Sequence, residues 1–416
     1  MIYPQLHCGF YLHGNKIYIS REDLLDEMVA GVNLREKIHN IPADVRISRG
    51  AGRETIYYCF NETVFKTRDW SKEPEQTLKQ LYVERCQQLR DKYDYLILSY
   101  SGGADSHEIL YTFLDNNIFI DEIQVVHYSK ALNRFDKNEL MKDASIKTLL
   151  EFDIMVKPQL KIIADRSPNT KINLLDASDF TVGDIVSNKF SSLGMDKFVS
   201  NPSFVTMKTP YTRNYFQHHH NHDHAVRKNN AAFIRGVEKP SLNISDNHLQ
   251  FRFSDASMHS VKMIQKKDVD DIYTIENFFW TPDCPLIPIK QSHVIKRKLE
   301  SDKDFYAAFM YSQERAIVFN KADVSPSLVG NIGRRYDELI YYYWNSNMFV
   351  APKPGTRSPE YELVSLIQKD NAAAEALEEY NKFYFKKYAK VAEKELLGKH
   401  IFTEPYTIGE LNVSWY

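Results

Sequence analysis

The sequence predicts an α/β protein with a parallel, twisted sheet and helices on both faces. The apolar run Tyr95–Tyr100 is typical of a strand that is buried on both faces. A loop with two adjacent glycines follows this run and leads into a helical pattern in which Ile109, Leu110 and Phe113 are apolar. A second strand pattern, Ile123–Tyr128, then completes a βαβ unit, whose strands are parallel and joined by a right-handed crossover.

The composition is that of a globular protein with more than one domain. The chain has 416 residues, of which 43% are hydrophobic and 26% charged. The net charge of −2 gives no reason to expect non-specific nucleic-acid binding. The four cysteines lie far apart, which argues against a zinc ribbon or a disulfide framework. We expect a cytoplasmic protein without membrane partners, because there is neither a secretory signal nor an apolar run of ~20 residues.

The first region, residues 1–72, is predicted to be small and rich in β-structure. Strand patterns at Val45–Ser48 and Thr55–Phe60 flank a glycine-containing loop, which is typical of a hairpin. The pattern then changes to helical spacing. The residues that share one helical face are Leu78, Leu81, Tyr82, Cys86 and Leu89.

The α/β domain is predicted to span residues 73–260. Beyond its βαβ unit we expect further strands at Lys171–Leu175 and Ala231–Arg235, and a hairpin between Leu249–Phe253 and the residues near Leu242. Residues 261–416 are expected to be mainly helical and to complete the substrate site. Their clearest helical pattern is Asn371–Leu397, which Gly398 ends.

The loop with two adjacent glycines is the strongest functional signal. It reads Ser101-Gly102-Gly103-Ala104-Asp105-Ser106 and lies between a buried strand and a helix. Backbone N–H groups at a helix N-terminus beside glycines bind anions, and the serine hydroxyls add donors. Asp105 is a carboxylate ligand of the kind that Mg²⁺ prefers. The alternative is a tight structural turn in which Asp105 only caps the helix.

This loop resembles the pyrophosphate-binding loop of the PP-loop ATP pyrophosphatases. That superfamily includes the asparagine, GMP, NAD and argininosuccinate synthetases and several tRNA-modifying enzymes. The resemblance implies an adenine nucleotide alpha-hydrolase-like fold, with ATP and Mg²⁺ bound and with AMP and pyrophosphate as products. It assigns the following residues to nucleotide binding: Ser101, Gly102, Gly103, Asp105, Ser106 and His127.

A second segment, Gly236–Pro240, looks like a shortened form of the glycine- and acid-rich loop that follows a later core strand in asparagine synthetases. The resemblance implies that Gly236 contacts the nucleotide and that Glu238 joins Asp105 in holding Mg²⁺. It also implies that Lys239 neutralises charge on the α-phosphate, so that Asp105 and Lys239 are the catalytic residues. The segment departs from the family's G-E-G-x-D-E pattern by carrying one acid and a lysine. The alternative is an ordinary turn with a surface ion pair.

Two further segments have more ordinary explanations. The stretch Phe278–Pro285, with Lys290 and His293, resembles asparagine-synthetase-like proteins of large phages, but core packing explains its aromatic residues better. The histidine-rich stretch Gln217–His224 is predicted to be a polar loop over the active site; the alternative is a transition-metal site.

Residues 1–72 do not match the glutaminase domain of asparagine synthetases. That domain needs a processed N-terminal cysteine as its nucleophile, whereas Ile2 follows Met1 here and the first cysteine is Cys8. The region is interpreted as a degenerate relic of a glutaminase or as unrelated to one. We therefore expect ammonia or an amine, and not glutamine, as the nitrogen source.

The resemblance implies an ATP-dependent, AMP-forming carbon–nitrogen ligase. It would adenylate a carboxylate or amide-like oxygen of a small molecule, such as an amino acid, and then transfer nitrogen to it. Its location would be the cytoplasm, or the host cytoplasm if a phage encodes it. The alternatives are a PP-loop enzyme that modifies a nucleotide or nucleic-acid base, which the net charge does not support, and a non-catalytic nucleotide-binding or assembly protein.

Overall fold

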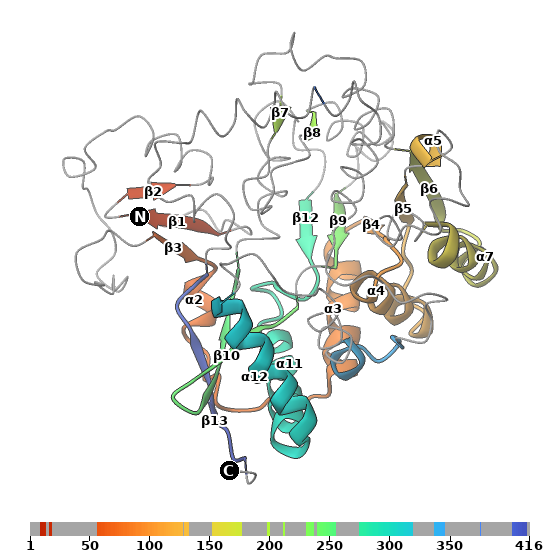
Figure 1. Cartoon of the computed structure of the whole chain (residues 1–416). Coiled ribbons are helices and arrows are strands. Elements are labelled where there is room, and N and C mark those ends of the chain that lie inside the picture. Colours follow the sequence, from red (N-terminus) through yellow and green to blue (C-terminus); the bar gives the residue numbers. More distant parts are fainter. Residues whose placement is uncertain are drawn as a thin grey trace.

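The fold is described from a computed structural model, shown in Figure 1. The residues that it describes are 9–13, 16–18, 56–127, 129–132, 152–176, 198–199, 211–212, 230–236, 239–254, 274–318, 337–345, 375 and 402–413.

A five-stranded parallel sheet forms the centre of the protein. Its strands are β4 (Tyr95–Ser99), β5 (Glu122–His127), β6 (Lys171–Asp176), β9 (Ala231–Arg235) and β12 (Thr274–Asn277). They lie in the order β12-β9-β4-β5-β6, and all neighbours are parallel. The middle strand, β4, is fully buried at Leu96, Ile97 and Leu98, as a strand covered on both faces must be. The predicted parallel α/β sheet is confirmed.

The order of the strands creates a switch point between β4 and β9. From β4 the chain moves outward through β5 to β6, and then returns to the other side of β4 to form β9 and β12. The register pairs Tyr95 with Ala231 and Leu98 with Ile234, so the loops after both strands leave from the same edge of the sheet. In open α/β sheets, ligands bind at the carboxyl ends of the strands where the connections diverge.

Three helices form a layer against the sheet: α3 (Leu78–Lys92), α4 (Ala104–Asp115) and α7 (Lys157–Arg166). Helix α3 begins with a capping box between Thr77 and Gln80 and contacts α4. Helix α4 contacts α7 through Tyr111 Oη, which donates to Gln159 Oε1 at 2.6 Å. A helical layer on the opposite face, which the sequence predicted, is not among the described elements.

Among the described residues, three antiparallel sheets lie outside the parallel one, and the smallest is the pair β7 (Phe198–Val199) and β8 (Tyr211–Thr212). In the first, β1 (Phe10–His13) pairs with β2 (Lys16–Tyr18) and β3 (Ile56–Cys59), which agrees with a β-rich first region. The predicted strand Val45–Ser48 lies outside the described residues. In the second, β10 (Ser241–Ser245) and β11 (His248–Arg252) form the predicted hairpin. The third strand of that sheet, β13 (Tyr406–Glu410), was not expected in a mainly helical region.

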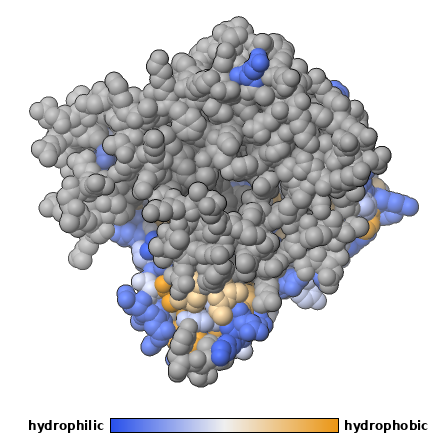
Figure 2. Space-filling view, viewed as in Figure 1, coloured by the Kyte–Doolittle hydropathy of each residue, from blue (hydrophilic) through white to orange (hydrophobic). Residues whose placement is uncertain are grey.

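The remaining elements are short connections and two long helices. Helices α11 (Leu286–Ser301) and α12 (Lys303–Val318) follow one another in the chain (Figure 1). On the coloured, lower part of the surface in Figure 2, hydrophobic residues lie beside hydrophilic ones. None of the described helices has both the length and the apolar character needed to cross a membrane. Of the predicted helix Asn371–Leu397 only residue 375 is described. The short elements are α2 (Glu62–Phe65), α5 (Ser129–Leu132), η3 (Phe152–Val156, a π-helical turn), β7 (Phe198–Val199) and β8 (Tyr211–Thr212).

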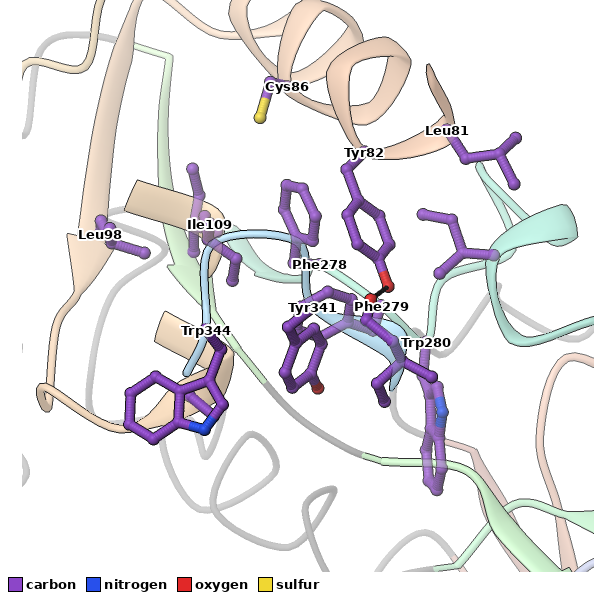
Figure 3. Close-up of a cluster of buried hydrophobic side chains, with 14 of the residues drawn as sticks. Leu81, Tyr82, Cys86, Leu98, Ile109, Phe278, Phe279, Trp280, Tyr341 and Trp344 are labelled. Atoms are coloured by element: carbon purple, nitrogen blue, oxygen red, sulfur yellow. Dashed lines mark hydrogen bonds between the residues drawn. The ribbon is translucent and has the colours of Figure 1, made fainter. Parts of the chain in front are cut away.

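Aromatic side chains fill the core on the helical side of the sheet (Figure 3). Phe278, Phe279 and Trp280 follow β12 directly and are fully buried. Tyr82 of α3 meets Phe279 edge-on, with ring centroids 5.4 Å apart, and the tilted ring of Tyr341 contacts Phe279 with centroids 5.1 Å apart. The aromatic stretch is therefore core, which is the explanation that the sequence favoured.

Candidate functional site

The glycine loop ends at a helix N-terminus that no side chain caps. Gly103 is the N-cap residue of α4, and the first amide of the helix with a backbone partner is that of His107, which donates to Gly103 O at 2.9 Å. The amides that come before it in the first turn have no partner within the helix, as at any helix start. They lie at the positive end of the helix dipole. This arrangement fits an anion.

Serine hydroxyls hold the loop closed beneath these amides. Ser101 Oγ and Ser106 Oγ lie 3.2 Å apart, and Ser106 Oγ donates to Gly103 O at 3.2 Å. Gly102 has a φ of +77°, and a Cβ on it would lie 2.8 Å from Val156 Cγ2 in η3. Gly102 is therefore needed for the conformation of the turn and for its packing against η3.

Asp105 does not cap its helix, because it lies inside α4, and its side chain contacts other segments. Its Oδ1 accepts a hydrogen bond from Tyr341 Oη, and its Oδ2 lies 3.8 Å from Lys239 Nζ. Lys239 also pairs with Asp337, at 2.8 Å. The structure thus brings together Asp105 and Lys239, the two residues that the sequence predicted to be catalytic. Both side chains are partly exposed, at 27% and 37%, so they are accessible to a ligand.

The segment after β9 packs against the start of α4. A Cβ on Gly236 would lie 3.0 Å from both the Asp105 carbonyl carbon and Ile109 Cδ1. At such a close approach a larger residue would fit only if the start of α4 shifted, so glycine suits this position. Since β4 and β9 are neighbours, the two predicted motifs meet at the switch point of the sheet. Glu238, the predicted second metal ligand, lies outside the described residues.

His127 lies at the carboxyl end of β5, the strand next to β4. Its ring stacks on Phe152 of η3 with centroids 4.4 Å apart, and its Nδ1 lies 2.9 Å from Ser129 Oγ. Burial lowers the pKa of His127, which favours the neutral ring at pH 7. The η3 turn thus contacts both His127, through Phe152, and Gly102, through Val156. π-helical turns are rare, and many of them occur at functional sites.

Comparisons with models of protein families, with curated proteins and with solved structures find no match for this chain. A functional assignment therefore depends on the loop, on the topology of the sheet and on the contacts of Asp105.

The sequence analysis missed two residues at this site, Asp337 and Tyr341. Both belong to a short helical turn, and Tyr341 lies 236 residues after Asp105 in the chain. No motif surrounds them. The sequence signal was an acid and a tyrosine four residues apart, which places both on one face of a helix. That spacing does not reveal what the face contacts.

Glu108 is a second ionisable group near the start of α4. It is fully buried, its Oε2 accepts from the backbone N–H of Tyr343 at 2.7 Å, and its Oε1 has no hydrogen-bond partner among the described residues. Burial raises the pKa of Glu108 to about 7. Since a hydrogen bond to its ionised form opposes this shift only in part, desolvation dominates.

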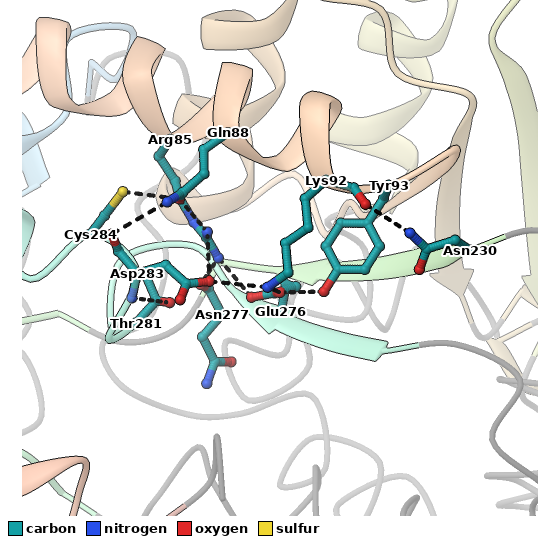
Figure 4. A network of polar contacts seen from close by, with 10 residues as sticks. All are labelled: Arg85, Gln88, Lys92, Tyr93, Asn230, Glu276, Asn277, Thr281, Asp283 and Cys284. Carbon is teal, nitrogen blue, oxygen red and sulfur yellow. Dashed lines mark hydrogen bonds and ion pairs between the residues drawn. The ribbon is translucent and has the colours of Figure 1, made fainter. Parts of the chain in front are cut away.

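A second polar network lies between α3 and β12 (Figure 4) and has a structural role. Arg85, which is fully buried, pairs with Glu276 at 2.8 Å, and Glu276 also accepts from Lys92 at 2.9 Å and from Tyr93 Oη at 2.5 Å. Asp283 joins it from a more exposed position, 3.2 Å from Lys92. These charges satisfy one another, as buried charges must.

Other segments that the sequence analysis singled out are placed elsewhere or not described. Lys290 donates to Pro74 O at 2.8 Å, and His293 contacts Trp70 O at 3.0 Å, so both tie α11 to the segment that precedes α3. The histidine-rich stretch Gln217–His224 lies outside the described residues. Within the described part, no group of three or more His, Cys, Asp or Glu side chains is placed to hold a metal ion.

Proposed function

We propose that this protein is an ATP-dependent ligase of the PP-loop type, which forms AMP and pyrophosphate and has the adenine nucleotide alpha-hydrolase-like form of the α/β fold. The observation that carries the proposal is the S-G-G-A-D-S loop at an uncapped helix start, at the switch point of a parallel sheet. The contact between Asp105 and Lys239 supports it, because it places a carboxylate and a cation beside that loop.

The residues of the loop would bind the pyrophosphate part of ATP. The amides in the first turn of α4 would donate to phosphate oxygens, and the hydroxyl of Ser101 would add a donor from the side. Ser106, whose hydroxyl donates to Gly103 O, would keep the loop in shape. Lys239 would face the α-phosphate and offset the charge that develops there. His127, stacked on Phe152, would border the nucleotide at the end of β5.

The site fits Mg²⁺. This ion usually keeps several waters and binds through one or two carboxylates together with substrate phosphates, so a cluster of three ligands is not required. Asp105 offers one partly exposed carboxylate, and Glu238 would supply the second. When bound, Mg²⁺ would neutralise negative charge on the phosphates.

The proposed reaction has two steps. A carboxylate or amide-like oxygen of a small molecule attacks the α-phosphorus of ATP, and the bond between that phosphorus and the pyrophosphate oxygen breaks. Ammonia or an amine then attacks the adenylated carbon, loses a proton and displaces AMP, so that a C–N bond replaces a C–O bond. The protein contributes mainly position and charge neutralisation, which are the principal needs of chemistry at phosphorus. Because ATP and free carboxylates are its substrates, a cytoplasmic location is part of the proposal.

The test is incubation of the protein with Mg²⁺, ammonium and ATP labelled in the α-phosphate or, in a parallel reaction, in the γ-phosphate, together with pools of small carboxylates. We expect AMP and pyrophosphate in equal amounts. Ser106→Ala should slow AMP formation by ~10-fold or more. The matched control is Ser292→Ala, which removes another buried hydroxyl that bonds a backbone carbonyl, at 2.7 Å in α11. ADP and phosphate as the only products would contradict the mechanism, and AMP formed only when RNA is added would replace the small-molecule substrate with a nucleic acid.

A further inference from the structure

A short helical turn holds both predicted catalytic side chains. Residues 337–340 are helical, and Tyr341 N donates to Asp337 O at 2.9 Å, so Asp337 and Tyr341 lie on the same face four residues apart. Tyr341 Oη donates to Asp105 Oδ1, and Asp337 Oδ1 lies 2.8 Å from Lys239 Nζ. Tyr341 therefore contacts Asp105, and Asp337 contacts Lys239.

The turn is itself fixed by buried contacts. Tyr82 Oη donates to Ile340 O at 2.8 Å and accepts from Gln291 Nε2 at 2.9 Å. On the other side, the backbone N–H of Tyr343 donates to Glu108 Oε2 at 2.7 Å. Tyr82 and Gln291 are themselves fully buried. A side chain that leaves such a turn has little freedom to move, which is what a precisely held site requires.

The contacts of Tyr341 give Asp105 a defined orientation. The Tyr341 side chain is almost fully buried, whereas Asp105 is partly exposed. The tyrosine holds Oδ1 from the protein side, which leaves Oδ2 on the side of Lys239. Burial raises the pKa of Tyr341 well above its ordinary value, so its hydroxyl remains a donor at neutral pH.

We infer that Asp337 and Tyr341 are positioning residues of the proposed ligase: Tyr341 orients Asp105 toward Mg²⁺, and Asp337 holds Lys239 toward the α-phosphate. This inference deepens the proposed function and rests on it. It explains why residues so late in the chain pack against the glycine loop. Neither residue touches the reacting atoms, so each acts through its partner.

The first variant is Tyr341→Phe, which keeps the buried ring and removes only the hydroxyl. Its matched control is Tyr93→Phe, which removes another buried tyrosine hydroxyl that donates to a carboxylate, Glu276 Oε1, at 2.5 Å. Two quantities are measured: the dissociation constant of Mg²⁺ from the protein with a non-hydrolysable ATP analogue, followed by tryptophan fluorescence without turnover, and the Mg²⁺ concentration that gives half-maximal AMP formation. We expect both to rise by ~10-fold in Tyr341→Phe and to stay unchanged in Tyr93→Phe, since a hydrogen bond to a charged group contributes that much.

A double-mutant cycle with Asp105→Asn separates positioning from a general structural role. If Tyr341 acts through Asp105, Tyr341→Phe causes little further loss once Asp105 is already Asn. Asp337→Asn tests whether Asp337 holds Lys239, and it does so even if Tyr341→Phe fails to fold. It should lower kcat by ~10-fold without a change in the Mg²⁺ requirement, and have little effect in a Lys239→Met background.

The outcomes distinguish the inference from the function on which it rests. A wild-type protein that forms no AMP under any of the conditions tested contradicts the proposed function, and the inference with it. An active wild type in which Tyr341→Phe behaves like Tyr93→Phe, or in which its effect simply adds to that of Asp105→Asn, overturns the assignment of Tyr341 alone. Unchanged kcat in folded Asp337→Asn overturns the assignment of Asp337.

Discussion

At the scale of single residues, Asp105 carries most of the functional argument. A helix cap would accept a hydrogen bond from a backbone N–H of the first turn, whereas a metal ligand must offer a carboxylate oxygen to the ion. The N-cap of α4 is Gly103, and Asp105 instead contacts Tyr341 and Lys239 from two later segments. These contacts have no capping role, so Asp105 is not the cap of α4, and its role as a metal ligand stays a prediction.

Asp105→Asn should lower the rate of AMP formation by ~100-fold or more. The change removes one negative charge, and an amide oxygen is a poor substitute for a carboxylate as a ligand of a hard cation. The fold should persist, because the side chain is partly exposed. The measurements are AMP formation and the thermal unfolding midpoint. Unchanged AMP formation by the folded variant would contradict the assigned role.

Gly236→Ala should disturb the site through the backbone. The new Cβ would lie 3.0 Å from the Asp105 carbonyl carbon and 3.0 Å from Ile109 Cδ1, closer than side chains normally pack. The start of α4 must then shift, at a cost of ~1–3 kcal/mol in the free energy of unfolding. Urea unfolding and ATP binding both report on this shift. If neither changes, the two loops are not packed as tightly as described.

At the scale of elements, the contact between α3 and β12 depends on a buried carboxylate. Glu276→Gln should lower the free energy of unfolding by ~3–5 kcal/mol, because it leaves the charge of the buried Arg85 without its closest partner. Asp283→Asn is the matched control, since Asp283 meets the same cation at 3.6 Å but is 29% exposed. Its effect should be below ~1 kcal/mol. Equal losses in the two variants, measured by urea unfolding, would contradict this ranking.

Helix α4 should give the protein a pH-dependent stability through Glu108. Burial raises the pKa of Glu108 to about 7, whereas an unfolded glutamate has ~4.3. The folded state keeps a proton that the unfolded chain has released. This contribution to the free energy of unfolding is therefore complete below about pH 4.3, falls by up to ~1.4 kcal/mol per pH unit as the pH rises, and levels off above about 7.

Glu108→Gln removes this dependence. The variant should gain stability relative to wild type from about pH 5 to about pH 7, with a constant difference above that range. Urea unfolding at several pH values measures it. The neighbouring His107 has a pKa that burial lowers to about 4, so it adds a slope of opposite sign, but this is common to both proteins and cancels in the difference. A difference that does not vary with pH would contradict the prediction.

At the scale of the whole molecule, β13 packs against two segments that are far from it in the sequence, near Trp70 and in β11. Tyr406 of β13 stacks on Trp70 at 4.5 Å, and Trp70 stacks on Phe251 of β11 at 4.9 Å. Tyr406→Ala should lower the free energy of unfolding by ~3–5 kcal/mol through the cavity that it leaves. Tyr406→Phe is the matched control and should be close to neutral, because the buried hydroxyl has no hydrogen-bond partner among the described residues. Thermal unfolding followed by tryptophan fluorescence distinguishes the two variants.

Much of the α/β core was predictable because its signals are local. Strands β4, β5, β6 and β9 agree with the predicted ranges to within a residue or two, since apolar runs between turn residues mark buried strands. The hairpin of β10 and β11 was predictable for a similar reason: its turn residues, Asp246 and Asn247, adopt the left-handed conformation that such residues tolerate. The start of α4 followed from the two glycines that precede it.

The sequence by itself determined the parallel sheet, the glycine loop and the two candidate residues Asp105 and Lys239. Only the tertiary structure decided that the loops after β4 and β9 meet, that Asp337 and Tyr341 hold the pair, and that β13 closes the second sheet. The physical reason is that local periodicity reports which face of an element is buried, but not what covers it. Contacts between segments 236 residues apart depend on the packing of the whole chain, and no local pattern encodes them.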